Sequence, residues 1–564
     1  MKRSLQLVTA LSLAGYAFAG TVASDLKTNG NAPVTVVIQF TTAPSSTLLG
    51  QIAGQGVTGV KNFHYLAKTL VATVHAKQIP LIAQLPGVKY ISPDRSVKRH
   101  LDLTTATIGA NIAQQYGWTG QGIGVAVIDS GIDATSTDLK SGSTSRVVYS
   151  EDFVGTGTAD LYGHGTHIAG IIGANGAASA GKYKGIAPDA NLINLRVLDA
   201  TGAGADSAVI AAIDRAIELK STYNIRVINL SLGRGIYESF DLDPLCQAVE
   251  AAWNAGIVVV TSAGNDGRDD AASTFGYATI TAPGNDPFVI TVGAMKTEGT
   301  TGRSDDMVAS YSSKGPTIGD HFVKPDLVAP GNLIASLRAP GSTLDAEYPA
   351  NRVSPTVYGA PATDAPVYFT MNGTSMAAGV VSGAVALLLE QNPAMTPDQV
   401  KVRLMMDATK TFPASSIATD PDTGAMYTAY YDIFTIGAGY LDIYAALNDS
   451  TLAVGASPSP VAVWDSTSGD VSVVNANQIA SGQQIAWGQQ IAWGQQIAWG
   501  QRIAEGEAAV WGATAFVAGS SNVFSLGGAF AQSGTAGNHT IWNNSVTWAN
   551  DTTSAERASM KGER

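Results

Sequence analysis

The clearest pattern along the chain is a set of short, almost unbroken apolar runs within residues 101–449. The runs are residues 123–128, 227–230 and 257–260. Strands that are buried on both faces of a parallel sheet have this composition. Longer stretches with helix signals separate the runs. We therefore expect an α/β domain over residues 101–449, with its functional residues at the carboxyl ends of the strands.

Helix boundaries in this region carry recognisable capping residues. Asp243-Pro244 is typical of a helix start and Gly256 of its end. Thr396 and Gln399 form a predicted capping box. An apolar stretch predicts a further helix over about residues 376–390.

Residues 20–100 predict a smaller α+β domain. Three strand patterns occur at residues 34–40, 70–74 and 88–91, with helical stretches between them. Residues 1–19 differ from both domains: Lys2 and Arg3 precede an apolar run, and Ala17-Phe18-Ala19 follows it. The run is shorter than the ~20 residues of a spanning helix. We therefore interpret residues 1–19 as a secretory signal peptide rather than a membrane anchor.

Residues 450–564 change character. Seven of the nine tryptophans lie there, and Gln-Gln-Ile-Ala-Trp-Gly occurs three times between Gln483 and Gly500, with looser copies extending the repeat region to 477–506. A six-residue period suits short extended segments with glycine turns. A low-complexity Gln/Gly/Trp linker explains the composition equally well. We expect a C-terminal accessory region that is either β-rich or of low complexity, and a cell-surface association through it is one hypothesis.

Composition excludes several function classes. The 564 residues are enough for two to four domains, and 45% are apolar. A net charge of −12 argues against nucleic-acid binding. A single cysteine, Cys246, cannot form an internal disulfide or a thiolate metal site. No other stretch reads as a membrane span, so we expect a secreted protein.

Three short motifs contain the residues of nucleophilic catalysis. Asp129 follows a predicted strand, His164 lies in Gly163-His164-Gly165-Thr166-His167, and Ser375 lies in Gly373-Thr374-Ser375-Met376. Each alone has an ordinary explanation as a turn, a metal pair or a helix cap. Together they provide a carboxylate, an imidazole and a hydroxyl, which can activate a serine. Spacing alone does not decide between His164 and His167.

These motifs, in the order Asp, His, Ser, resemble those of the subtilisin-like serine proteases, the subtilases. The resemblance covers about residues 104–448. It implies a three-layer α/β fold with a mostly parallel sheet, and an endopeptidase that works through an acyl-enzyme. It assigns Asp129 as the orienting carboxylate, His164 as the general base and acid, and Ser375 as the nucleophile.

Two more segments are similar to family motifs. Asn265 would donate its amide to the oxyanion together with the Ser375 N–H. Substrate-binding positions would be Ser231, Leu232 and Gly233, on a segment whose main-chain groups pair with an extended peptide. Ser262, Ala263 and Gly264 would also bind substrate, as walls of its side-chain pockets. One departure is Gly379, where the family usually has proline after Ser375-Met376-Ala377. It leaves open an enzyme that acts mainly on esters or in transpeptidation.

Residues 20–100 resemble the family's inhibitory propeptide, most clearly at residues 85–94. The resemblance implies a folding chaperone and intramolecular inhibitor, and we expect self-cleavage near residues 98–105. The expected partners are extended polypeptides and this propeptide, and the mature enzyme is expected to be a monomer. No cofactor or metal is expected to be required, and structural calcium stays open because no acidic calcium loop is found. An inactive subtilase-like scaffold is the alternative function.

Overall fold

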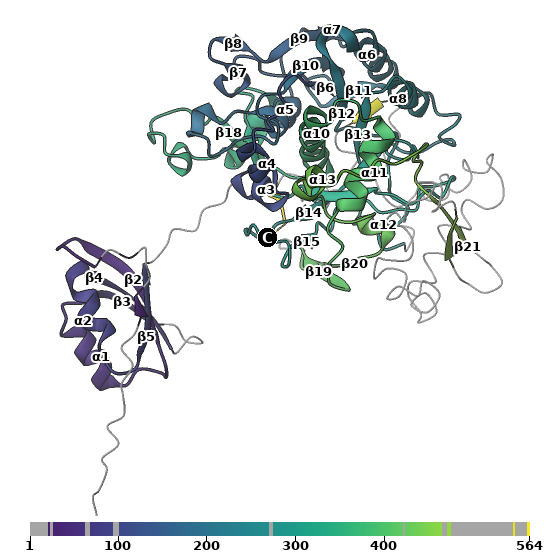
Figure 1. Ribbon diagram of the computed structural model, residues 1–564. Coiled ribbons are helices and arrows are strands. Elements are labelled where there is room, and N and C mark those ends of the chain that lie inside the picture. Colours follow the sequence, from purple (N-terminus) through teal and green to yellow (C-terminus); the bar gives the residue numbers. More distant parts are fainter. Residues whose placement is uncertain are drawn as a thin grey trace, which may run out of the picture. The chain divides into compact units, whose positions relative to one another are not determined.

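The computed structural model of the protein describes residues 21–22, 26, 28–62, 68–93, 101–269, 274–420, 423–464, 471–474, 545–547 and 561–563. The predicted signal peptide and the repeats at 477–506 lie outside these residues. The chain forms two compact units, Met1–Lys98 and Arg99–Arg564 (Figure 1). The predicted boundary at 449/450 does not coincide with a division between these units, and it stays a prediction.

The smaller unit is a five-stranded sheet with two short helices. Its strand order is β1-β5-β2-β4-β3, and β2 pairs antiparallel with both β4 and β5. Alternate residues of β2, among them Val36, Ile38 and Phe40, are buried. The apolar alternation thus produces a sheet with one face on a core, as expected for an α+β domain. Its elements are β1 (Thr21–Val22), β2 (Pro33–Phe40), α1 (Ser46–Ala53), β3 (Thr58–Asn62), β4 (Thr69–His75), η1 (Ala76–Gln78), α2 (Ile79–Ala83) and β5 (Val88–Pro93).

A mostly parallel sheet forms the centre of the larger unit. Its order is β15-β14-β13-β12-β6-β10-β9, with β16 also paired to β14. Only β15 runs antiparallel to its neighbour. Every residue of β6 is buried, which explains its continuous apolar sequence. The strands are β6 (Gly124–Asp129), β9 (Val147–Asp152), β10 (Asn191–Arg196), β12 (Ile225–Leu230), β13 (Val258–Ser262), β14 (Ile290–Lys296), β15 (Met307–Val308) and β16 (Leu327–Pro330).

Helices pack against this sheet in two groups. Helices α5 (His164–Gly173) and α10 (Thr374–Gln391) contact each other and the sheet, and α6 (Asp206–Glu218) and α8 (Pro244–Asn254) form the second group (Figure 1). The predicted caps are present: Asp243 accepts from the Leu245 N–H at the start of α8, and Thr396 and Gln399 form a capping box on α11. The predicted α/β three-layer fold is confirmed. The remaining described α-helices are α3 (Leu101–Thr107), α4 (Ala110–Gln115), α7 (Lys220–Tyr223), α9 (Thr343–Glu347), α11 (Pro397–Asp407), α12 (Ile433–Ile436) and α13 (Ile443–Asn448), and the short 3-10 helices are η2 (Thr137–Leu139), η3 (Ala177–Ser179), η4 (Pro349–Asn351) and η5 (Pro355–Tyr358).

Helix α10 lies in the core of the larger unit. It begins at Thr374, two residues earlier than predicted, so Ser375 lies inside its first turn. By length and composition it is the one helix among the described residues that could cross a membrane, yet 89% of that stretch is buried inside the protein. Its apolar character is therefore that of a core helix.

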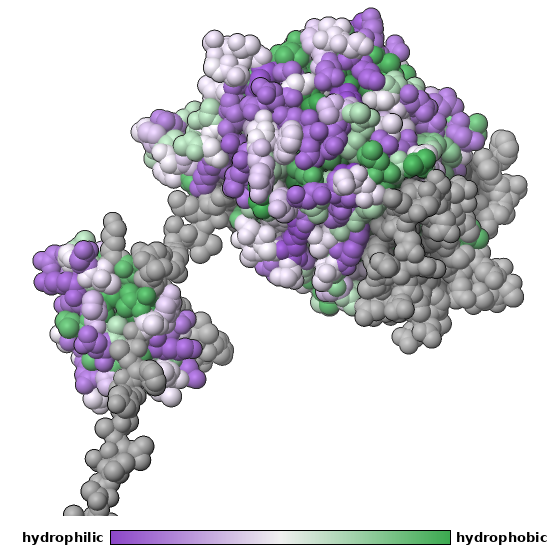
Figure 2. Space-filling model, in the orientation of Figure 1, coloured by the Kyte–Doolittle hydropathy of each residue, from purple (hydrophilic) through white to green (hydrophobic). Residues whose placement is uncertain are grey.

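Hydrophilic residues cover much of the visible protein surface (Figure 2).

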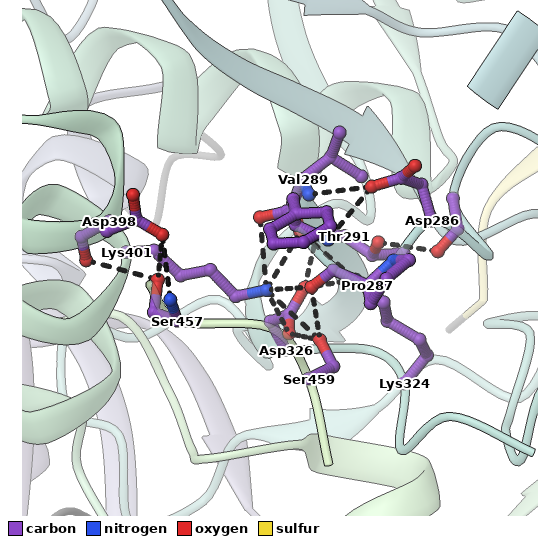
Figure 3. Close-up of polar contacts among 12 residues, drawn as sticks. Asp286, Pro287, Val289, Thr291, Lys324, Asp326, Asp398, Lys401, Ser457 and Ser459 are labelled. Atoms are coloured by element: carbon purple, nitrogen blue, oxygen red, sulfur yellow. Dashed lines mark hydrogen bonds and ion pairs between the residues drawn. The ribbon is translucent and has the colours of Figure 1, made fainter. Parts of the chain in front are cut away.

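The larger unit also contains a buried cluster of charges, which we call the lysine cluster: Lys324, Asp326 and Lys401, all with fully buried side chains. Asp326 lies 2.8 Å from Lys324 Nζ and 3.1 Å from Lys401 Nζ, and its Oδ1 accepts a hydrogen bond of 2.6 Å from Ser459 (Figure 3). Since Ser459 follows the predicted end of the catalytic domain, part of the 450–564 region packs into the same core.

Shorter strands complete the described structure. β21 (Val461–Trp464) pairs with β22 (Val471–Val474), and β23 (Ser545–Thr547) pairs antiparallel with β11 (Ala203–Ala205). The C-terminal region thus contributes strands to the larger unit. Further pairs are β7 (Lys140–Ser141) with β8 (Thr144–Ser145), β17 (Ile334–Leu337) with β18 (Tyr368–Met371), and β19 (Ser415–Thr419) with β20 (Met426–Tyr430).

Candidate active site

Three neighbouring strands bring the predicted site residues to one edge of the sheet. Strands β6, β12 and β13 are adjacent and parallel, and they end at Asp129, Leu230 and Ser262. The segments 231–233 and 262–265 begin where β12 and β13 end. The order of the strands, which the sequence does not state, therefore places Asp129 beside the predicted substrate-binding segments.

Asp129 and His164 are in direct contact. His164 Nδ1 lies 2.8 Å from Asp129 Oδ1 and 3.0 Å from Oδ2, and both side chains are fully buried. Asp129 Oδ1 also accepts from the Ser130 N–H at 2.7 Å. A carboxylate held at Nδ1 fixes the imidazole with its proton on that nitrogen and Nε2 as the basic atom.

A close approach of the backbone makes this contact possible. His164 is the first residue of α5, and a Cβ on Gly165 would lie 2.2 Å from the Gly131 carbonyl oxygen and 3.1 Å from Asp129 Cβ. Only glycine fits at this distance. The glycine after His164 therefore lets the first turn of α5 lie against the end of β6.

A second carboxylate, Asp160, supports this turn, and the sequence reading did not select it. Asp160 accepts from the Gly163 N–H at 2.6 Å, the Thr166 N–H at 2.8 Å and the Ser130 hydroxyl at 2.8 Å. Burial raises the pKa of Asp160, although these hydrogen bonds oppose the shift. Asp160 satisfies N–H groups that the start of a helix leaves without partners. Its position just before the Gly-His-Gly motif was the available signal.

The structure separates the two histidines of the motif. His167 Nε2 lies 3.1 Å from the main-chain oxygens of both Ile334 and Phe369. Burial and the neighbouring His164 lower the pKa of His167 to about 3. His167 is thus a neutral residue that connects α5 to β17 and β18, and no group of His, Cys, Asp or Glu suited to a metal occurs among the described residues.

Ser375 lies in the first turn of α10 and bonds to the segment after β12. Its hydroxyl donates to the Ser231 carbonyl at 3.2 Å, and the Ser231 hydroxyl donates to the Ser375 carbonyl at 2.9 Å. Asn229 connects this pair to the helix, since it donates to Ser231 Oγ and accepts from Ser382 Oγ. A buried polar chain therefore fixes the start of α10 relative to β12.

Asn265 contacts the residue next to Ser375. Its Oδ1 accepts from the Thr374 N–H at 3.0 Å and from the Thr374 hydroxyl at 3.1 Å. Its Nδ2 lies 3.5 Å from the position that a Cβ would take on Gly373. The amide oxygen is thus engaged with the start of α10, and the amide nitrogen lies on the side of Gly373.

The other predicted substrate-binding residues line the same edge. The Gly264 N–H lies 3.2 Å from the Thr374 hydroxyl oxygen, and the Ala263 carbonyl accepts from the Thr281 N–H at 3.1 Å. Ser262 ends β13, and Leu232 is buried beside Ser231. A Cβ on Gly233 would lie 2.6 Å from Thr281 Oγ1. Segments 231–233 and 262–264 thus converge on the start of α10 and on Thr281.

Gly379 has a packing explanation. A Cβ at this position would lie 3.3 Å from Ile171 Cγ2 and 3.6 Å from Ile168 Cγ2, both on α5. The residue that departs from the family pattern therefore lies where α10 approaches the helix that carries His164. Its small size allows the close packing of the two helices.

Comparisons with known proteins identify the relatives of this chain. Residues 120–424 match the subtilase family. Serine protease AprX of Bacillus subtilis (strain 168) is 39% identical over 330 residues, which cover 57% of this chain and 69% of that protein. Subtilisin E of the same organism is 34% identical over 361 residues, which cover 64% and 80%. The extracellular serine proteinase of Thermus sp. (strain Rt41A) is 34% identical over 345 residues, which cover 59% and 69%.

Proposed function

Because the chain belongs to the subtilase family of serine proteases, we propose that it is a secreted endopeptidase whose nucleophile is Ser375. The observation that carries the proposal is the buried pair of Asp129 and His164, with 2.8 Å between Nδ1 and Oδ1. Such a pair prepares Nε2 of the imidazole to accept a proton from a hydroxyl.

In the proposed reaction, His164 Nε2 takes the proton of the Ser375 hydroxyl as Oγ attacks the peptide carbonyl. The hydroxyl, which donates to the Ser231 carbonyl in the resting chain, turns to Nε2 for this step. The imidazolium then protonates the leaving amine, and Asp129 stabilises its charge. Water hydrolyses the acyl-enzyme by the same proton route.

We further propose that Asn265 Nδ2 and the Ser375 N–H donate to the oxyanion. Ser375 is the second residue of α10, so its N–H is among those that have no acceptor within the helix. The Asn265 amide is oriented by Thr374 before any substrate binds. Donors fixed in this way stabilise charge as it develops in the transition state.

The proposed substrates are extended polypeptides. Segments 231–233 and 262–264 would pair with the main chain of a peptide, as in strand addition. Main-chain pairing is similar for every sequence, so this mode favours broad specificity. We propose no required cofactor, a monomeric mature enzyme and no nucleic-acid partner.

Maturation and location are part of the proposal. The names of the relatives include an extracellular proteinase, and Lys2, Arg3 and the following apolar run support export through residues 1–19. Residues 20–100 would act as chaperone and inhibitor until self-cleavage near residues 98–105. Residues 101–105 belong to α3, whereas residues 94–100 are outside the described part of the chain.

A fluorophosphonate probe tests the proposal directly. The wild-type chain should be labelled at Ser375, and Ser375→Ala should remain unlabelled although it is folded, which its cooperative thermal unfolding would show. Failure of the folded wild type to react would support the alternative of an inactive scaffold. Amino-terminal sequencing of both proteins checks self-cleavage, because only the wild type should lose residues 20–100.

A further inference from the structure

The last described residues, Lys561–Glu563, occupy a slot in the larger unit that the proposed mechanism does not use. Glu563 is only 5% exposed. Its Oε1 lies 2.8 Å from Arg268 Nη2, and its Oε1 and Oε2 accept from the Ser310 N–H at 3.0 and 3.1 Å. Its Oε2 lies 3.9 Å from Lys296 Nζ. A carboxylate this deeply buried requires such charged and N–H partners.

The slot also binds the main chain of residue 563. The Glu563 N–H donates to Asn332 Oδ1 at 3.0 Å, and Asn332 Nδ2 donates to the Glu563 carbonyl at 2.9 Å. Both ends of the Asn332 amide therefore pair with one residue of the tail, as a neighbouring strand would.

The residue before Glu563 has to be glycine. Gly562 has a φ of +72°, which favours glycine. A Cβ there would lie 2.4 Å from Leu333 Cδ2 and 2.6 Å from Asn372 Oδ1. The slot is thus shaped for a glycine followed by a glutamate.

The slot depends on a carboxylate. Ser310 is 3% exposed, and its N–H is directed at both oxygens of Glu563. Arg268 and Lys296 have other partners, Asp420 at 3.1 Å and Glu298 at 3.2 Å. Withdrawal of the tail would therefore leave the Ser310 N–H buried without its acceptor, which is unfavourable.

The walls of the slot continue to the predicted nucleophile. Gly331, beside Asn332, accepts from the Gly373 N–H at 2.9 Å, and the Leu333 N–H donates to Asn372 Oδ1. Gly373 is two residues before Ser375. A second attachment of the C-terminal region is the pairing of β23 with β11.

We propose that these contacts form a specific binding site for a Gly-Glu peptide, whose ligand is the chain's own C-terminal Gly562-Glu563. The site fastens the end of the C-terminal region to the catalytic unit, so the tail is a structural part of that unit. The proposal does not depend on whether the chain cleaves peptide bonds. The experiments below measure melting temperature and hydrogen exchange, not enzyme activity.

Full-length variants test the site. Glu563→Gln keeps the shape and removes the charge, so the melting temperature should fall by about 3–8 °C. Gly562→Val should lower it similarly, whereas Glu347→Gln, at an exposed position, should leave it unchanged. In Glu563→Gln, hydrogen exchange of the segment 309–313 should accelerate at least about tenfold, since Ser310 loses its charged acceptor. An unchanged melting temperature and unchanged exchange would overturn the proposal.

A peptide in trans tests the specificity. In a Ser375→Ala chain that lacks residues 561–564, Ser-Met-Lys-Gly-Glu-Arg should restore the lost melting temperature, and Ser-Met-Lys-Gly-Gln-Arg should not. Equal effects of the two peptides would refute recognition of the carboxylate. If the truncated chain does not fold, hydrogen exchange in the full-length Glu563→Gln chain decides the question.

Discussion

Two buried groups of charges in the larger unit differ in what their surroundings permit. In the lysine cluster, Asp326 has two lysines, the Ser459 hydroxyl and the Thr291 N–H as partners. At the sheet edge, Asp129 has the Ser130 N–H and one ring nitrogen of His164. The first carboxylate faces two lysine ammonium groups, and the second faces an imidazole, a side chain that serves as a general base and acid in catalysis.

The difference is one of chemistry rather than burial. Burial alone would raise the pKa of Asp326, but Lys324 and Lys401 outweigh it and hold the pKa below its usual range. Burial lowers the pKa of Lys401 to about 8 although Asp326 opposes this shift. The oxygens of Asp326 in the lysine cluster thus all have hydrogen-bond or ion-pair partners, and the cluster serves a structural role. The pair of Asp129 and His164 keeps Nε2 for the proposed proton transfer.

The largest effect is expected from Asp129→Asn. The new amide would keep Oδ1 on the Ser130 N–H and direct its NH2 toward His164 Nδ1, so the ring proton would move to Nε2. The general base would then be lost, and kcat should fall about 10⁴-fold, the magnitude known for such triads. Steady-state kinetics on a peptide substrate measures this. A loss of less than tenfold would contradict the assigned role of Asp129.

Asp326→Asn should lower stability and leave kcat nearly unchanged, the opposite of Asp129→Asn. The change leaves two buried ammonium groups without their carboxylate, and the free energy of unfolding should fall by about 3–5 kcal/mol. Denaturant unfolding measures the loss, and kcat of the folded fraction should change little. Asp364→Asn, at an exposed position, is the matched control. Equal stability of the two variants would show that the cluster is not a structural element.

Asn265→Asp tests the proposed oxyanion donor. The variant keeps an oxygen that can accept from Thr374 but loses the Nδ2 donor. We expect kcat to fall about 10²–10³-fold, with KM nearly unchanged, because the lost bond forms only in the transition state. A rise in KM with unchanged kcat would indicate that Asn265 binds the substrate instead.

Asp306→Asn tests how the stability of the protein depends on pH. Burial, Asp305 and Glu298 raise the pKa of Asp306 to about 7, despite Arg303 and Tyr440. Between an unfolded pKa near 3.8 and about 7, the folded chain binds more protons, so stability falls as pH rises. Removal of this group should stabilise the protein by about 2–4 kcal/mol at pH 8, and progressively less as pH falls toward 4. Denaturant unfolding at several pH values from 4 to 8 measures this difference in stability. A difference between the two proteins that does not change with pH would contradict the prediction.

The smallest effect is expected from Gly379→Ala. Alanine gains about 0.5–1 kcal/mol of helix stability, and the 3.3 Å contact with Ile171 opposes this gain. Stability should therefore change by less than about 1 kcal/mol. The ratio of peptide to ester hydrolysis should also stay constant, because Gly379 contacts the packed side of α5. A large change in this ratio would support the alternative that the enzyme acts mainly on esters.

Local sequence was sufficient for most elements. Apolar runs identified β6, β12 and β13 because both faces of these strands are buried. The caps at Asp243 and Thr396 were readable because a cap bonds to residues two or three positions away. The start of α10 was misplaced by two residues, because its first turn is held by distant partners, Asn265 and Ser231.

By itself the sequence determined the α/β class, the types of the main elements and the three motifs that resemble subtilases. Tertiary structure decided which side chains contact each other. His164 contacts Asp129, and His167 contacts β17 and β18. Asp160 binds the start of α5, and Glu563 binds in the slot that contains Arg268. The physical reason is distance along the chain. Periodicity and capping act over a few residues, whereas these contacts join segments separated by up to 295 positions and exist only once the sheet has brought them together.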